Sequence, residues 1–101
     1  MLIYNTTMKV DWNIHDAWLQ WLCDIHIPGI LFTGCFEKHQ LLRLIETDDT
    51  DGPTYALQLY AENQDNYNKY LSLHQPALNR AMLDLWSHHV LTFSTLMQVV
   101  H

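Results

Sequence analysis

The chain has 101 residues, of which 49% are hydrophobic and 16% charged, and its net charge is -6. Its basic residues are scattered, whereas nucleic acid and anionic membrane surfaces require a concentrated positive patch, so we expect neither as a partner. No apolar run approaches the ~20 residues that span a bilayer, and the N-terminus lacks the features of a secretory signal. Two cysteines, Cys23 and Cys35, are too few for a disulfide framework, which predicts buried thiols in a cytoplasmic protein.

Alternating side chains predict four strands in a single domain that covers residues 1–101. The strands are expected over residues 2–10, 35–45, 54–62 and 89–100. Between the second and third strands, the polar segment 46–53 contains Asp51-Gly52, which is typical of a hairpin turn. In the second strand, one face is expected to carry His39, Leu41, Arg43 and Ile45, and the other Phe36, Leu42 and Leu44.

The first helix is predicted over residues 14–25, where apolar side chains recur at spacings of three and four. Asn13 is expected to act as its N-cap, since its side chain can accept a hydrogen bond from the first turn. Pro28-Gly29 is expected to stop this helix, and one further turn over residues 30–33 leads to Gly34 as a C-cap.

The second helix begins near Gln64, and Pro76 is expected to kink or break it after His74. The order of elements is therefore β-α-β-β-α-β. With right-handed crossovers this order gives a four-stranded antiparallel sheet with both helices on one face. The predicted fold is ferredoxin-like, of the α+β class.

The face of the sheet away from the helices is expected to mix two kinds of side chain. The expected members are apolar Ile3, Leu41, Ile45, Ala56 and Tyr60, and polar Asn5, Thr7, Arg43 and Gln58. A solvated sheet face is usually polar throughout. The mixture therefore predicts a homodimer in which two sheets pack face to face as a barrel, with the helices outside.

Several short segments together resemble one known family. They are Ile3-Tyr4-Asn5, Trp18-Leu19-Gln20-Trp21, Ile27-Pro28, Thr33-Gly34-Cys35-Phe36, Leu42-Arg43-Leu44, Thr54-Tyr55-Ala56-Leu57-Gln58 and Phe93-Ser94-Thr95-Leu96. In this order they resemble the short bacterial proteins of the domain of unknown function 4286, over nearly the whole chain. The resemblance implies a ferredoxin-like, dimeric α+β barrel, a group that includes cofactor-free monooxygenases of antibiotic biosynthesis, isomerases and haem enzymes. The family has no established activity, so no catalytic residue carries over.

A repeated pattern marks two histidines as candidate catalytic residues. Trp21-Leu22 precedes His26-x-Pro28, and Tyr70-Leu71 precedes His74-x-Pro76. Facing one pocket, the two imidazoles would serve as a base or a proton shuttle. The alternative is that each ring packs in the core and binds carbonyl groups left free by the proline. His74 is favoured over His26 because it falls within the apolar stripe of the second helix.

Arg43 lies between two leucines of a predicted strand, so we expect it on the open face of the sheet. A half-buried guanidinium needs an anion or carbonyl groups. The sequence therefore predicts a ligand-binding group on this face, made of Arg43, Asn5, Thr7, Gln58, Tyr60 and Ser94. The alternative is a structural ion pair with Glu37, Glu46, Glu62 or an acidic group across the dimer.

No metal or cofactor is predicted, because the histidines lack metal-ligand spacing and Asp49-x-Asp51-Gly52 lacks the later ligands of a calcium loop. Nucleotide and nucleophile motifs are missing too. The sequence thus predicts a homodimer that binds a small, aromatic molecule, as a cofactor-free monooxygenase- or isomerase-like enzyme. The alternatives are a non-catalytic dimerisation or assembly module, and a haem-binding relative in which His74 ligates the iron.

Overall fold

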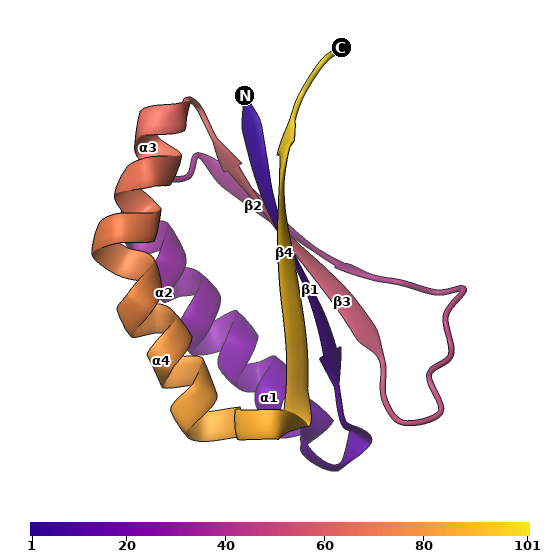
Figure 1. Cartoon of the computed structure of the whole chain (residues 1–101). Coiled ribbons are helices and arrows are strands. Elements are labelled where there is room, and N and C mark those ends of the chain that lie inside the picture. Colours follow the sequence, from indigo (N-terminus) through magenta and orange to yellow (C-terminus); the bar gives the residue numbers. More distant parts are fainter.

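Four strands form one antiparallel sheet, and two long helices pack on one of its faces (Figure 1). In the computed structural model, which describes residues 1–101, the strands are β1 (Leu2–Val10), β2 (Lys38–Arg43), β3 (Thr54–Ala61) and β4 (Val90–Gln98). Their order across the sheet is β2-β3-β1-β4, and each neighbouring pair is antiparallel. This arrangement is the ferredoxin-like β-α-β-β-α-β fold that the sequence predicts.

Each long helix contains a π-helical turn in its middle. The first consists of a 3₁₀ turn (Trp12–Ile14), α1 (His15–Trp21), a π-helical turn (Leu22–His26) and α2 (Ile27–Phe32). The second consists of α3 (Gln64–Lys69), a π-helical turn (Tyr70–His74), α4 (Gln75–Trp86) and a 3₁₀ turn (Ser87–His89). None of the helices has the length and apolar character needed to cross a bilayer.

Each long helix has a proline just after its π-helical turn, with one residue between the turn and the proline. Pro28 and Pro76 lie in the first turns of α2 and α4, and a proline has no N–H to donate in a regular helix. A π-helical turn inserts one extra residue and lets the chain stay helical past this point. The predicted stop at Pro28 is therefore wrong, since the helix continues to Phe32. The predicted irregularity at His74 is present as a π-helical turn rather than as a break.

The two ends of the first helix were predicted with different success. Asn13 is not an N-cap, because it lies inside the 3₁₀ turn that follows Asp11, and no side chain caps this helix start. Gly34 has a φ of 75°, and its N–H donates to the Leu31 carbonyl at 3.1 Å. The predicted glycine C-cap is therefore confirmed.

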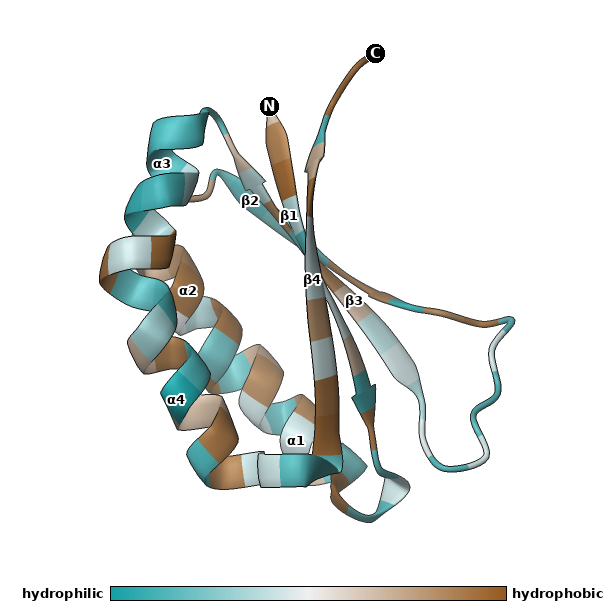
Figure 2. Ribbon diagram, in the orientation of Figure 1, coloured by the Kyte–Doolittle hydropathy of each residue, from teal (hydrophilic) through white to brown (hydrophobic).

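The core lies between the helices and the sheet and is thin. Its largest fully buried hydrophobic side chains are Trp18, Met8, Leu22, Leu59 and Val10. Only 20 of the 101 residues are buried, whereas β4 exposes hydrophobic side chains along much of its length (Figure 2). The molecule therefore keeps apolar surface available on the sheet.

Strand β2 presents its two faces the opposite way from the prediction. Residues paired directly across an antiparallel ladder share a face. Arg43 pairs with Tyr55 and Leu41 pairs with Leu57, and both partners belong to the core on the helix side. Arg43 and Leu41 therefore face the helix side, and Leu42 faces the open side.

The reason for the error is that alternation alone does not say which half of a strand faces the core. Adjacent Leu41 and Leu42 place an apolar residue on each face of the strand, so the pattern fits either assignment of the two faces equally well. The strand also ends at Arg43, so Ile45 lies beyond it and is exposed.

Candidate functional site

A cavity of about 70 Å³ lies between the long helices and the sheet. The strands contribute Tyr4, Thr6, Leu59, Thr92 and Ser94, and the helices contribute His26, Ile30, Tyr70, Gln75, Leu78, Asn79 and Met82. No lining residue carries a charged carboxylate, ammonium or guanidinium group. Asn79, Thr92 and Ser94 are exposed, so the cavity opens between α4 and β4. This volume holds several water molecules or part of a small organic molecule.

His26 is the predicted catalytic candidate that the structure places in this cavity. It ends the π-helical turn of the first helix, is 8% exposed and stacks on Trp21 with ring centroids 4.6 Å apart. Burial lowers the pKa of the His26 imidazole to about 4, because a low-dielectric surrounding disfavours the charged form. His26 is therefore a neutral imidazole at pH 7.

Tyr70 faces the same cavity from the second helix and was not predicted as a site residue. It is 3% exposed and packs its ring against Phe36, with centroids 4.8 Å apart. Burial is also the main cause that raises the pKa of the Tyr70 hydroxyl above its ordinary value, so this group remains a neutral donor. In the sequence, Tyr70 could have been identified as a site residue only from its position in the repeated pattern, where it corresponds to Trp21.

The polar groups of the cavity are mostly free of partners within the chain. The only hydrogen bond between lining side chains joins Thr6 Oγ1 and Ser94 Oγ at 3.1 Å. The His26 imidazole and the Tyr70 hydroxyl have no such partner. Because an imidazole with a pKa near 4 is a weak base, it does not deprotonate ordinary alcohols or carbon acids. The arrangement is therefore suited to hydrogen-bonding a neutral molecule.

His74 lies on the other side of the helical layer, so the two histidines do not share a pocket as predicted. It lines an outer groove between the helices, together with Phe32 and Leu73. Leu78 borders both this groove and the cavity and lies between them. The repeated sequence reproduced the local π-helical geometry in both helices, but the packing of each helix decides which way its histidine faces.

Haem does not fit the cavity that contains His26. The cavity of about 70 Å³ is far below the roughly 300–1,000 Å³ of pockets that enclose drug-sized molecules, so it has room for a small molecule but not for haem. The groove at His74 is larger, about 330 Å³, but it is open, and His74 is its one side chain suited to ligating iron. No group of three or more histidine, cysteine, aspartate or glutamate side chains comes together in a way that could hold a metal ion.

The ligand-binding group predicted on the open sheet face is divided in the structure. Asn5, Thr7, Gln58 and Tyr60 do share that face, as their cross-strand pairing shows. Ser94 instead lies on the helix side, where it lines the cavity beside Thr6. Arg43 also faces the helix side, at the edge of the sheet.

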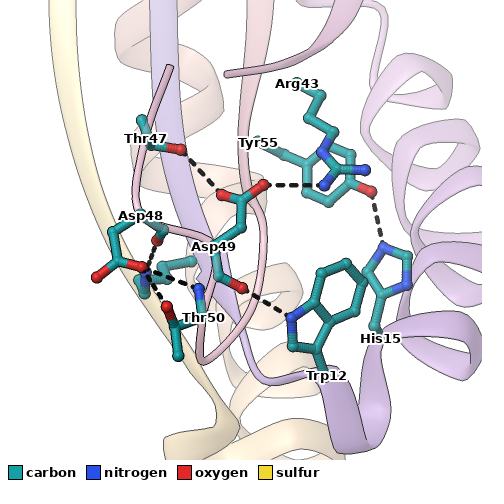
Figure 3. Close-up of polar contacts among 9 residues, drawn as sticks. Trp12, His15, Arg43, Thr47, Asp48, Asp49, Thr50 and Tyr55 are labelled. Atoms are coloured by element: carbon teal, nitrogen blue, oxygen red, sulfur yellow. Dashed lines mark hydrogen bonds and ion pairs between the residues drawn. The ribbon is translucent and has the colours of Figure 1, made fainter. Parts of the chain in front are cut away.

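Arg43 holds the loop between β2 and β3 (Figure 3). Its Nη2 donates to Asp49 Oδ2 at 2.9 Å, and its guanidinium lies 5.8 Å from the centre of the Trp12 ring. The Trp12 indole N–H donates to the Asp49 carbonyl at 2.8 Å. Hydrogen bonding from Arg43 is the main cause that holds the pKa of Asp49 below its ordinary value. The structural ion pair that was the alternative is thus present, but with Asp49 rather than a glutamate.

A second polar cluster beside this loop was not predicted. His15 Nε2 and the Tyr55 hydroxyl are 2.7 Å apart (Figure 3). His15 Nδ1 is 2.8 Å from Asp16 Oδ1. The Asp16 carboxylate accepts from Nδ1–H, so Nε2 is left to accept from the Tyr55 hydroxyl. The contact between residues 15 and 55 depends on how α1 packs on β3, which no local pattern reveals.

The two cysteines differ in exposure. Cys35 is buried, whereas Cys23 is exposed, and both are free thiols. The prediction of two buried thiols is therefore wrong for Cys23, which lies in the first π-helical turn.

Solved structures with the same fold come from different organisms. A protein of the ethyl tert-butyl ether (ethd) family from Bacillus halodurans has a TM-score of 0.75 at 8% identity, over 99% of this chain and 100% of that one. SnoaB, a cofactor-independent oxygenase from Streptomyces nogalater, has a TM-score of 0.69 at 12% identity. The likeness covers 99% of this chain and 94% of SnoaB. A dimeric ferredoxin-like protein from an uncultured marine organism has a TM-score of 0.68 at 11% identity, over 99% of this chain and 95% of that one. At such low identity these likenesses show the fold alone.

In sequence, the chain matches a family rather than an individual protein. No curated protein matches it. One family model covers residues 1–100, which includes every segment on which the resemblance was based. The chain therefore belongs to the family described as Domain of unknown function (DUF4286).

Proposed function

We propose that this protein is a homodimer that binds a small neutral molecule in the cavity between its helices and its sheet. The proposal rests on one observation: two largely buried, neutral residues, His26 and Tyr70, line the cavity, and their polar atoms make no hydrogen bond within the chain. Because these polar atoms reach the cavity, water can bind them in the free protein, and a ligand that bears a hydroxyl or carbonyl group would replace that water and keep its hydrogen bonds.

The lining also favours a class of ligand. An uncharged lining gives no oppositely charged partner to a carboxylate or an ammonium group, and burying an unpaired charge is unfavourable. The rings of Tyr4 and Tyr70 lie with centroids 6.2 Å apart beside the cavity, which favours a flat ring over a branched aliphatic group. We therefore expect a small phenol, quinone or cyclic ketone.

A cofactor-free oxygenase or isomerase activity is the more specific form of this proposal. The likeness in fold to a cofactor-independent oxygenase supports it. However, the low pKa of His26 restricts such chemistry to a substrate that is itself acidic. Binding is therefore the function that the geometry supports best, and a non-catalytic dimerisation module is the alternative that needs no ligand.

We further propose that the second subunit covers the open face of the sheet. This face carries exposed Phe93 and Leu91, and a solved structure of the same fold is described as dimeric. Packing two such faces would bury apolar surface, which is the main driving force for association. Two free thiols suit the reducing cytoplasm, where we expect this dimer to act.

Ligand binding is tested by thermal unfolding in the presence of phenol and cyclohexanone, because a quinone would react with the exposed thiol of Cys23. Benzoate and benzylamine are the matched charged compounds. Saturation at a hundred times Kd stabilises a protein by about 2.7 kcal/mol, so we expect a rise in Tm with a neutral compound alone. His26→Ala and Tyr70→Phe should lose this rise.

His74→Ala is the matched control, since His74 lies outside the cavity, and it should keep the rise in Tm. Equal stabilisation of the wild type and His26→Ala would place the ligand elsewhere. No rise with any neutral compound would favour the non-catalytic module.

A further inference from the structure

A row of uncharged polar side chains crosses the open face of the sheet on all four strands. Cross-strand pairing places Gln40 opposite Gln58, Gln58 opposite Asn5, and Asn5 opposite Thr95. Asn5 points to the open side because its neighbours along β1, Tyr4 and Thr6, line the cavity on the other side. We call Gln40, Gln58, Asn5 and Thr95 the amide row.

Apolar side chains border the amide row on both sides. The next row toward the start of β1 contains Lys38 at the sheet edge and then Tyr60, Ile3 and Met97. The next row toward its end contains Leu42, Ala56, Thr7 and Phe93. Phe93 is 67% exposed. A polar band between two largely apolar bands differs from the uniformly polar face that meets water, which indicates that this face is covered.

The amides of the row have unused hydrogen-bonding capacity. Asn5 Nδ2 donates to Thr7 Oγ1 at 3.3 Å, and the Tyr60 hydroxyl donates to Gln58 Oε1 at 3.4 Å. Each amide group offers two donors and one acceptor oxygen, so Asn5 Oδ1 and Gln58 Nε2 remain free. Because amides both donate and accept, such a row is complementary to another copy of itself.

The charges on this face lie outside the row and already have partners. Lys38 lies 4.5 Å from the centre of the Tyr60 ring, and Lys9 Nζ donates to the Asp48 carbonyl at 3.0 Å. No acidic side chain occupies the paired positions of the face. A strongly charged partner would therefore find no matching pattern, whereas a second copy of this chain would.

We propose that the amide row of one protomer faces the amide row of its partner and sets the register of the homodimer. This inference rests on the sheet-face dimer proposed above and names the side chains that determine its geometry. Apolar bands alone would let one sheet slide across the other. A shifted register would bury the amides against apolar groups without partners, which is unfavourable. A buried asparagine selects the register of coiled coils for the same reason.

The test gives the row opposite charges in two variants, Asn5→Asp and Asn5→Lys. In each variant alone, like charges meet across the interface, and the dissociation constant of the dimer should rise by about tenfold or more. An equimolar mixture should form heterodimers in excess of the share expected from random pairing. Native mass spectrometry and sedimentation velocity measure both effects.

Matched variants carry the same changes outside the sheet, at Asn68 on the exposed surface of α3. Asn68→Asp and Asn68→Lys should dimerise as the wild type does and should pair at random. Gln40→Glu and Gln40→Lys repeat the test at an exposed position of the edge strand, so that a folding defect at Asn5 does not decide the result.

The outcomes separate this inference from the dimer on which it rests. A monomeric wild type would overturn both. A dimeric wild type whose oppositely charged variants still dimerise normally and pair at random would overturn the role of the amide row and leave the dimer standing.

Discussion

His26 links the candidate binding cavity to the stability of the fold. Its ring is buried between Trp21 and the cavity, and burial lowers its pKa from 6.5 to about 4. In the unfolded chain the imidazole regains its ordinary pKa. Between these two values the unfolded state binds a proton that the folded state does not bind.

We therefore expect the free energy of unfolding to fall as the pH is lowered from 6.5 to 4. The loss contributed by His26 should reach about 3 kcal/mol at the lower end of this range. Asp48 and Asp49 have pKa values below 3.8, so their contributions are lost at lower pH. Urea denaturation at several pH values measures the slope.

His26→Gln should flatten this slope, since glutamine does not titrate. His74→Gln is the control that keeps the slope, because His74 is outside the cavity. An unchanged slope in His26→Gln would show that another group causes the pH dependence.

At the scale of single elements, two glycines differ in the space that their surroundings leave for a side chain. Gly29 lies inside α2, and an added Cβ would meet only Leu78 Cδ2, at an ordinary contact of 3.6 Å. Gly52 lies in the loop just before Pro53 and β3, and an added Cβ would overlap the Val10 carbonyl group. The first site has room for a side chain, and the second does not.

Gly29→Ala should raise the free energy of unfolding by about 1 kcal/mol, because alanine is the better helix former. Gly52→Ala should lower it by roughly 2–4 kcal/mol, since the backbone at Val10 must move. Urea titration of both variants measures these changes. Stabilisation by Gly52→Ala would contradict the close approach of this loop to β1.

At the scale of the whole molecule, the thin core and the exposed sheet face together predict association. The wild type should have about twice the monomer mass of 11.9 kDa in light scattering. Phe93→Lys places a charge in the apolar band beside the amide row and should yield monomers, because a lone charge is unfavourable in a buried interface. Leu83→Lys, on the exposed surface of α4, is the matched control and should remain dimeric. A monomeric wild type at micromolar concentration would contradict the proposed dimer.

Local patterns in the sequence determined the order and type of the elements. Alternation placed Tyr4 and Met8 of β1 and Leu57 and Leu59 of β3 on the core side, as the structure confirms. These strands are central in the sheet, and each has one face that is mostly apolar. The sequence also identified His26 as a candidate, because a repeated pattern with proline marks the π-helical turns.

Only the tertiary structure decided which of these candidates meet. It separated His26 from His74, moved Arg43 and Ser94 off the open face, and added Tyr70 to the cavity. The phase of β2 and the direction of each histidine depend on how whole elements pack against one another. That packing minimises the free energy of contacts between residues far apart in the chain, and such contacts leave no periodic signal in the sequence.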